Sequence, residues 1–218
     1  MTKVHPNTRS TTASQPPKPL NSSDGDASTS VVLTVWKKSL LFNCDGFTVF
    51  DSKGNLVFRV DNYMAGDKGK IVLMDAFGNS LFTILRKRLS LGDSWLVFEG
   101  EKEVNPSYTV RKQVNFLRGK SLALVTPGSC KETILSQNRN KVLYKIEGSY
   151  TKRCCAVHDE KRRPMAEIKQ KEAAVRGVSF GMDVFHLIVH SEFDLAFAMA
   201  LVILLDQMFG SSTSTRRN

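Results

Sequence analysis

The stretch SEFDLAFAMALVILLDQMFG, Ser191 to Gly210, is the most apolar part of this 218-residue chain. Ser191 and Asp194 have the spacing of a helix capping box, and Gly210 is suited to end a helix. We therefore expect one helix over 191–210, with Ser191 as its N-cap.

This helix is too short to cross a bilayer. Its uncharged part, Leu195 to Leu205, has eleven residues, whereas a bilayer core requires about 20. Asp194 and Asp206 bracket that part, and each would cost about 2.5–3.5 kcal/mol inside hydrocarbon. Because the stretch is apolar around its whole circumference, we expect it in the middle of a protein core rather than in a membrane.

Short apolar runs separated by turn residues fill most of the remaining chain, a pattern typical of β-strands. Some runs alternate clearly: Phe185, Leu187 and Val189 share one strand face, opposite His186 and His190. About a dozen strands are expected, at 31–36, 47–51, 56–60, 71–75, 80–85, 94–100, 107–114, 121–125, 133–137, 142–148, 154–159, 165–171 and 183–190.

A hairpin motif recurs in these strands. VFDSKGNLVFRV (49–60) matches LMDAFGNSLFTI (73–84), and VHDEKRRPMAEI (157–168) keeps the Asp but has Arg162 and Arg163 in place of Gly-Asn. Asp accepts hydrogen bonds within its own turn, and Gly or Asn adopts a positive φ, so the motif predicts tight hairpins. Repeated hairpins suit an antiparallel meander, and closing it into a barrel around the apolar helix removes its exposed edges.

The two ends of the chain differ from this pattern. Residues 1–30, rich in Ser, Thr and Pro, are predicted to be a disordered arm, 31–210 the folded domain, and 211–218 a disordered basic tail. The N-terminus MTKVHPNTRSTTASQ lacks the apolar core of a secretory signal. The four cysteines show no disulfide framework. We therefore expect a cytoplasmic or nuclear protein that is not secreted and that attaches, if at all, peripherally to membranes.

Three blocks of the sequence resemble the LURP-one-related family of plants: 33–63, 86–101 and 177–208. The resemblance implies a tubby-like fold, that is, a mainly β, closed antiparallel barrel of about twelve strands around a central buried C-terminal helix. It also implies kinship with the phosphoinositide-binding tubby proteins and with phospholipid scramblases, and a link to plant defence. No stretch matches the tubby phosphoinositide motif closely enough to transfer its residues.

Catalytic and metal motifs are weak. RGKS (118–121) lacks the Gly that a phosphate-binding loop needs, because that position is Val114. Cys154 and Cys155 should point to opposite strand faces, one thiol buried and one exposed, which disfavours a shared metal site. No histidine lies in a motif that marks it as a base. We expect no enzyme activity, cofactor, metal or catalytic residue; whether Cys154 or Cys155 is lipidated stays open.

The basic clusters of this chain, whose net charge is +10, form either one site for anionic headgroups or scattered, solvated surface charge. Lys37 and Lys38 follow the first strand, and Lys161 precedes two arginines in a turn. The candidate contacts to anionic phospholipid headgroups are Arg86, Lys87, Arg88, Arg118, Lys120, Lys152, Arg153, Arg162 and Arg163.

The principal hypothesis is a non-enzymatic protein tethered to phosphoinositides or anionic membranes, in signalling or transcription. The alternatives are a scramblase-type lipid transporter and a nucleic-acid-binding protein. The nucleic-acid-binding alternative is disfavoured, because the sequence shows no helix-turn-helix, no zinc finger and no aromatics interleaved with the basic clusters.

Overall fold

The computed structural model describes residues 30–41, 45–62, 69–87, 93–113, 121–128, 141–171 and 181–210. Residues 1–29 and 211–218, expected as arm and tail, and the expected strand 133–137 lie outside this described part. The elements in it are β1 (Ser30–Trp36), β2 (Asp45–Phe50), β3 (Leu56–Asn62), β4 (Lys70–Asp75), β5 (Ser80–Arg86), β6 (Ser94–Glu99), β7 (Tyr108–Lys112), β8 (Ser121–Pro127), β9 (Tyr144–Ser149), β10 (Cys154–Asp159), β11 (Pro164–Gln170), β12 (Val184–His190) and α1 (Leu195–Phe209).

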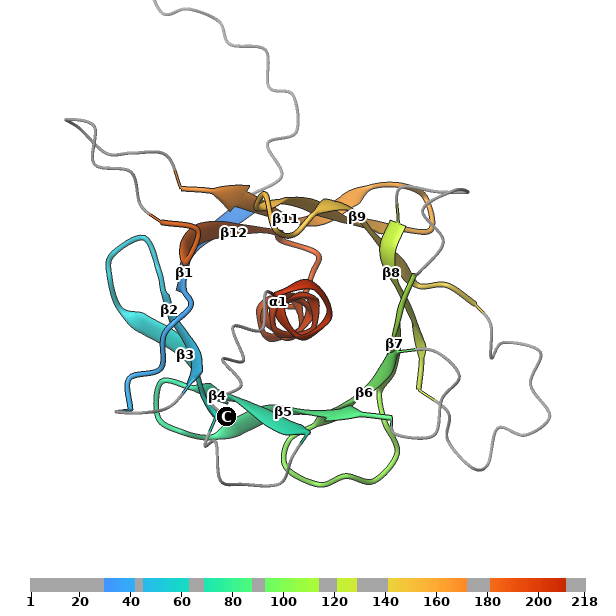
Figure 1. Cartoon of the computed structure of the whole chain (residues 1–218), viewed down its shortest axis with the longest axis horizontal. Helices are drawn as coiled ribbons and strands as arrows, with labels where there is room; N and C mark the ends of the chain where they lie inside the picture. Colours follow the sequence, from blue (N-terminus) through green and yellow to red (C-terminus); the bar gives the residue numbers. More distant parts are fainter. Residues whose placement is uncertain are drawn as a thin grey trace, which may run out of the picture.

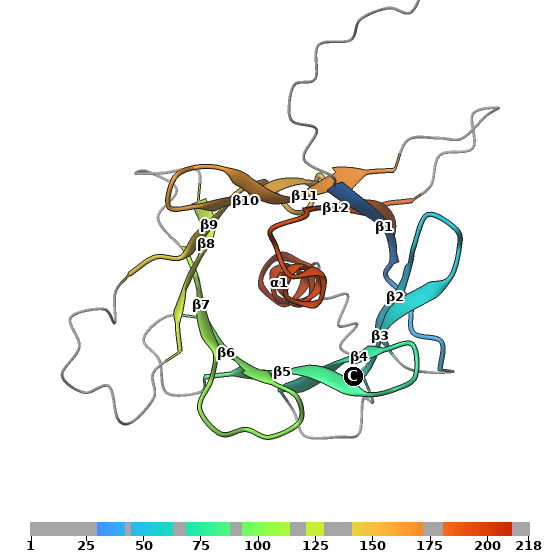
Figure 2. The same ribbon diagram turned by 180° about the vertical axis from the view of Figure 1, so that it is seen from behind.

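The twelve strands form a closed up-and-down barrel. Each strand pairs antiparallel with its neighbours in the chain, and β1 pairs with β12 over their full lengths to close the ring. Seen nearly along the axis of α1, the strands surround the helix on all sides (Figure 1), and the view from behind shows the same ring (Figure 2). The predicted fold class is therefore confirmed.

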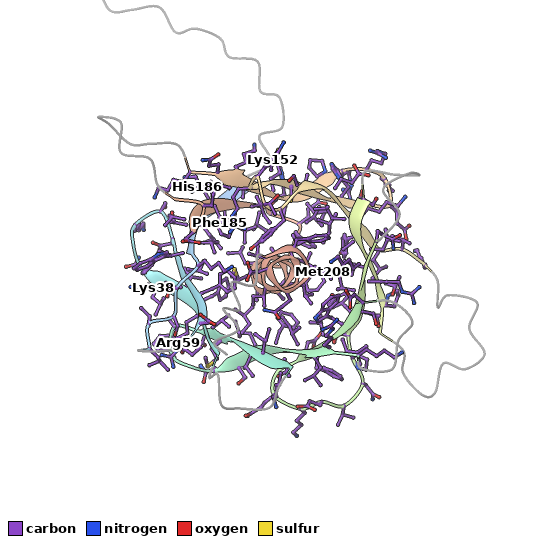
Figure 3. The ribbon with its side chains drawn as sticks, viewed as in Figure 1. Lys38, Arg59, Lys152, Phe185, His186 and Met208 are labelled. Atoms are coloured by element: carbon purple, nitrogen blue, oxygen red, sulfur yellow. The ribbon has the colours of Figure 1, made fainter. Side chains whose placement is uncertain are left out.

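Helix α1 fills the barrel. Every residue from Phe197 to Leu205 is buried, so no face of this part of the helix meets solvent. The wall contributes alternate side chains, as in β12, where Phe185, Leu187 and Val189 are at most 1% exposed. Figure 3 shows side chains occupying the space between the strands and the helix, with Phe185 labelled on β12 and Met208 on α1. Burial of so many large apolar side chains, each worth roughly 1.5–3 kcal/mol, makes the helix the centre of the core.

The start of the helix differs from the prediction. Asp194, not Ser191, is the N-cap: its Oδ1 accepts a hydrogen bond from the backbone N–H of Phe197 at 2.6 Å. The three residues before it turn the chain inward from β12, with the Phe193 N–H donating to the His190 carbonyl at 2.9 Å. Phe193 is then buried and packs edge-on against Tyr144. A plausible local capping box was thus overridden by the turn that brings the chain into the barrel.

The end of the helix is at Gly210, as predicted. Its N–H donates to the Asp206 carbonyl at 2.7 Å, and its φ of −61° is ordinary. A Cβ here would lie 2.4 Å from that carbonyl oxygen, so close approach rather than unusual backbone explains the glycine. Among the described residues, no helix has the length and apolar content needed to cross a membrane.

The three recurring hairpins share one turn. In each, the aspartate N–H bonds to the carbonyl of the residue four positions on, as in Asp51 to Asn55 at 2.9 Å, and the carboxylate accepts backbone N–H groups of the turn. Gly54 and Gly78 have φ of 84° and 91°, and Arg162 takes the same place with φ of 62°. Arg162 therefore occupies a backbone position that favours glycine.

Candidate functional site

The up-and-down order brings alternate connections to opposite ends of the barrel. We call the end at which α1 finishes the C-rim, and the end at which it begins the N-rim. The connections after β1, β3, β5, β7, β9 and β11 belong to the C-rim, and those after β2, β4, β6, β8 and β10 to the N-rim. The direction of the strands therefore decides which charged residues can act together.

The C-rim is basic. Its described strand ends and connections carry Lys37, Lys38, Lys70, Arg86, Lys87, Arg111, Lys112, Lys152, Arg153, Lys169 and Lys171 against Asp45, Asp61, Asp93, Asp183 and Asp206. The N-rim reverses the balance, with Asp51, Asp75, Glu99, Glu101, Glu103, Asp159, Glu160, Glu192 and Asp194 against Lys53, Lys102, Lys141, Lys145, Lys161, Arg162 and Arg163. The net charge of the chain is therefore unevenly distributed over the described barrel.

Part of the basic C-rim holds the helix in place. Lys112 Nζ donates to the Met208 carbonyl at 2.7 Å, and Lys37 Nζ lies 2.9 Å from Asp206 Oδ1. Tyr150 donates from its hydroxyl to the same carboxylate at 3.2 Å. Carbonyls at a helix C-terminus carry partial negative charge, which Asp206 increases, so cations stabilise this end. Lys37 and Lys112 consequently have structural partners.

Arg153 also has a structural place. Its side chain is buried and lies between the rings of Tyr150 and Phe185, with the guanidinium carbon 4.2 Å from each ring centroid. Its Nε donates to the Met182 carbonyl at 2.8 Å. Burial, and then the charge of Asp206, raises the pKa of Tyr150, which therefore stays a neutral hydrogen-bond donor. The Arg153 guanidinium thus joins two turns of the rim and does not face solvent.

A second set of cations is exposed. Arg86 ends β5, Lys87 follows it directly, and Arg111 lies on β7, with β6 between; we call these three the basic arc. The Lys87 N–H bonds to the Ser94 carbonyl at 2.9 Å, and Ser94 is the register partner of Arg111, so Lys87 and Arg111 lie level with each other on either side of β6. Arg86, the register partner of Trp95, lies at the same rim. Arg86 pairs with Asp93 and lies over the Trp95 ring, whereas Lys87 and Arg111 make no ion pair with another described residue.

Two further cations of the C-rim are exposed, and two predicted ones lie elsewhere. Lys38 and Lys152 are exposed without an ion pair to any described residue. Arg162 and Arg163 lie at the N-rim, where Arg163 bonds Asp159 and Glu192, at 2.8 and 2.9 Å, and Arg162 reaches Glu147 at 3.4 Å. The structure therefore brings Arg86, Lys87, Lys152 and Arg153 to one rim and separates Arg162 and Arg163 from them. Arg88, Arg118 and Lys120 lie outside the described residues.

A family model for the LURP-one-related proteins matches residues 31–206. This range contains most of α1 and all of the barrel except its first residue, Ser30. The chain belongs to the LURP-one-related family. It is 54% identical over 215 residues to Protein LURP-one-related 8 of Arabidopsis thaliana, a match covering 97% of this chain and 100% of that protein. Protein LURP-one-related 17 of the same plant is 46% identical over 190 residues, 81% of this chain and 82% of that protein.

A solved structure supports the fold of this family member. The X-ray structure of an Arabidopsis thaliana protein superimposes with a TM-score of 0.60 at 24% identity, covering 83% of this chain and 92% of that one. At this identity the similarity concerns the fold alone.

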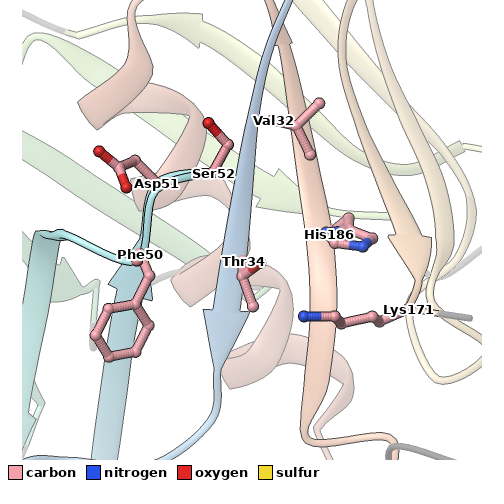
Figure 4. Close-up of a pocket in the computed structure, with 8 residues that line it drawn as sticks. Val32, Thr34, Phe50, Asp51, Ser52, Lys171 and His186 are labelled. Atoms are coloured by element: carbon pink, nitrogen blue, oxygen red, sulfur yellow. The ribbon is translucent and has the colours of Figure 1, made fainter. Parts of the chain in front are cut away.

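An open groove lies on the outer wall of the barrel, where β1 runs between β2 and β12 (Figure 4). Its volume is about 490 Å³, and Val32, Thr34, Phe50, Asp51, Ser52, Gly54, Lys171 and His186 line it. Burial, and then the charge of Lys171, lowers the pKa of His186, so the imidazole is neutral at neutral pH. The Asp51 carboxylate already accepts three hydrogen bonds in its own turn. The groove therefore holds one imidazole but no hydrogen-bonded acid–base pair.

The other chemistry considered from the sequence finds little support within the described residues. Cys154 is exposed and Cys155 buried, as predicted, and burial raises the pKa of the Cys155 thiol to about 12. His158 and His190 lie on the outer wall, 3.9 and 3.8 Å from Glu147 and Glu167. No group of acidic, histidine or cysteine side chains in the described part could hold a metal ion. Cys44, Cys130 and His5 lie outside that part.

Sequence reasoning missed Arg111 as a candidate. The sequence held a signal for it: Val110 in TVRKQ is an inward strand residue, so its neighbour Arg111 must point outward at the end of β7. The pairing of β5 with β6 and of β6 with β7 brings Arg111 to the same part of the rim as Arg86 and Lys87. The sequence pattern did not predict this pairing.

Proposed function

We propose that this protein is a non-enzymatic, tubby-like membrane-tethering domain that binds anionic phospholipid headgroups, phosphoinositides in particular, through the basic arc of the C-rim. In this proposal the barrel attaches reversibly to a membrane surface and serves signalling or transcription-related regulation in plant defence. The resemblance to the tubby and scramblase-like proteins motivates the choice of lipid.

The basic arc is the observation that carries the proposal. Lys87, after β5, and Arg111, on β7, lie on either side of β6 and are exposed without an ion-pair partner among the described residues, so no such partner has to be displaced. Arg presents a fork of donors that matches phosphate oxygens, and Lys adds a point charge. Each cation near an anionic surface contributes about 1 kcal/mol. Lys38 and Lys152 add to this attraction on the same rim.

Liposome co-sedimentation tests the proposal. The full chain should bind phosphatidylcholine vesicles that contain a phosphatidylinositol bisphosphate and should bind pure phosphatidylcholine vesicles much more weakly at physiological salt. The K87E/R111E variant should lose most of the difference. The matched control is K53E/K161E, which changes the net charge equally but at exposed lysines of the N-rim.

Two results would reject the proposal. One is equal binding of charged and neutral vesicles by the unmodified protein. The other is an equal loss in the two charge-reversal variants, because overall charge rather than the basic arc would then account for the attraction.

A further inference from the structure

Apolar side chains are exposed at the C-rim near Lys38 and Lys152. Trp36, Leu40, Leu41 and Met182 are 38%, 51%, 37% and 40% exposed, and they are four of the eight large hydrophobic residues exposed in the described part. We call these four the apolar arc. The Lys37 N–H bonds to the Asp183 carbonyl at 2.7 Å, so the connection after β1 and the turn before β12 lie side by side. The four residues therefore form one region of the rim.

Hydrogen bonds hold residues 37–41, the described part of the connection after β1, and Leu40 and Leu41 are exposed there. Ser39 is buried, its hydroxyl donates to Asp61, and it accepts the Leu41 N–H at 3.0 Å. Thr48 donates to the Lys38 carbonyl at 2.7 Å. These hydrogen bonds fix the backbone at residues 38, 39 and 41, between which Leu40 is exposed and beside which Leu41 is exposed. Exposed apolar groups gathered in one place mark interaction surfaces.

The charges around the apolar arc indicate what covers it. Lys38 Nζ lies 5.2 Å from the centre of the Trp36 ring, and Lys152 belongs to the turn that Arg153 ties to Met182. The exposed acidic residues nearby are Asp45 and Asp183. Trp beside Lys and Leu is the combination favoured at the headgroup level of bilayers. A second copy of the chain, paired about a twofold axis, would instead bring like lysines together.

We propose that the C-rim docks on anionic bilayers with the apolar arc inserted into the boundary between headgroups and acyl chains, while the basic arc binds headgroups. The inference rests on the proposed function and adds hydrophobic insertion to its electrostatic attraction. Insertion of apolar area and attraction to anionic lipid reinforce each other in peripheral binding.

The two tryptophans provide the test. Trp36 belongs to the apolar arc, whereas Trp95 is 4% exposed inside the barrel. With the full chain and vesicles of phosphatidylcholine plus phosphatidylinositol bisphosphate, we expect a blue shift of Trp fluorescence and quenching by lipids brominated on the acyl chain. The W36F variant, which keeps Trp95, should bind the same vesicles but lose the quenching.

The L40S/L41S variant should bind these vesicles about tenfold more weakly, because two apolar side chains no longer insert. The matched control is F77S/V104S, which changes two exposed hydrophobic residues outside the C-rim connections, 92% and 71% exposed, and should bind normally. All four positions are exposed, and thermal melting of each variant checks that the fold is retained.

The results separate the two proposals. If the protein binds anionic vesicles but Trp36 is not quenched and L40S/L41S binds normally, insertion is wrong and electrostatic binding stands. If the unmodified protein does not prefer anionic vesicles, both proposals are wrong. If L40S/L41S changes only the oligomeric state seen by sedimentation velocity, the apolar arc binds a second copy and the insertion proposal is rejected.

Discussion

Lys112 on β7 donates a hydrogen bond from Nζ to the carbonyl oxygen of Met208, 2.7 Å away, and so joins the barrel wall to the last turn of α1. The same Nζ lies 4.7 Å from the centre of the Phe209 ring. A helix C-terminus leaves its last carbonyls without intrahelical partners, and here a strand supplies one.

Replacing Lys112 with Met should therefore lower the free energy of unfolding by about 1–3 kcal/mol, since a buried carbonyl loses a charged donor. Urea denaturation measures the change. Lys87→Met is the matched control, because Lys87 is exposed and makes no ion pair within the described residues. Similar losses in the two variants would show that the Lys112–Met208 contact contributes little.

Removing α1 should abolish the fold. A chain that ends at Ser191 loses the side chains that fill the barrel, and strands that wrap a helix cannot close on an empty core without losing that burial. We expect no cooperative thermal transition, whereas a chain that ends at Gly210 should melt like the full protein. A cooperative transition in the shorter chain would contradict the central role of the helix.

A substitution that leaves a cavity beside the helix tests the contribution of α1 to the core with a smaller change than its removal. Leu204 is fully buried, so Leu204→Ala should cost about 2–5 kcal/mol of unfolding free energy. Gln207, in the next turn of α1, is exposed. Gln207→Ala should therefore be close to neutral in the same denaturation experiment, and a comparable loss there would mean that the effect is not one of core packing.

The fold could be predicted from the sequence because two periodicities are strong. An apolar helix without a polar face has one stable place, and hairpins with Asp and Gly-Asn fix their own turns. The N-cap was placed wrongly because Ser191 and Asp194 form a credible local motif, whereas the turn after His190 uses Ser191 to Phe193. That turn is set by where β12 ends against β1, which is tertiary information.

The site was less predictable, for reasons of strand direction and packing. In an up-and-down barrel successive strands run in opposite directions, so one additional strand reverses the direction of every strand after it. Counting the run 133–137 as a barrel strand would have placed Lys152 at the opposite rim, although the closed ladder runs directly from β8 to β9. The burial of Arg153 depends on Tyr150 and Phe185, which come from different hairpins.

The aspartates of the turns should make stability depend on acid pH. The side-chain hydrogen bond from Asn55 lowers the pKa of Asp51, and that from Asn79 lowers the pKa of Asp75. Below the ordinary carboxyl pKa of about 3.9 the unfolded chain binds protons that the folded turns do not, so stability falls with pH there. Chemical denaturation should show a smaller loss between about pH 5 and pH 3 in D51N/D75N. Asp183→Asn, outside these turns, should follow the unmodified protein; an unchanged pH profile in D51N/D75N would refute the assignment.

Gly46 should be intolerant of a side chain. A Cβ at this position would lie 1.8 Å from the Val60 carbonyl oxygen of β3 and 3.2 Å from the Cβ of Ser39, which anchors the connection after β1. Gly46→Ala must therefore separate β2 from β3 or displace that connection, and we expect a loss of about 1–3 kcal/mol or more. Gly181 has open space around its missing Cβ, so Gly181→Ala serves as the control and should be nearly neutral. Equal thermal melting of the two variants would show that strands β2 and β3 can yield at this contact.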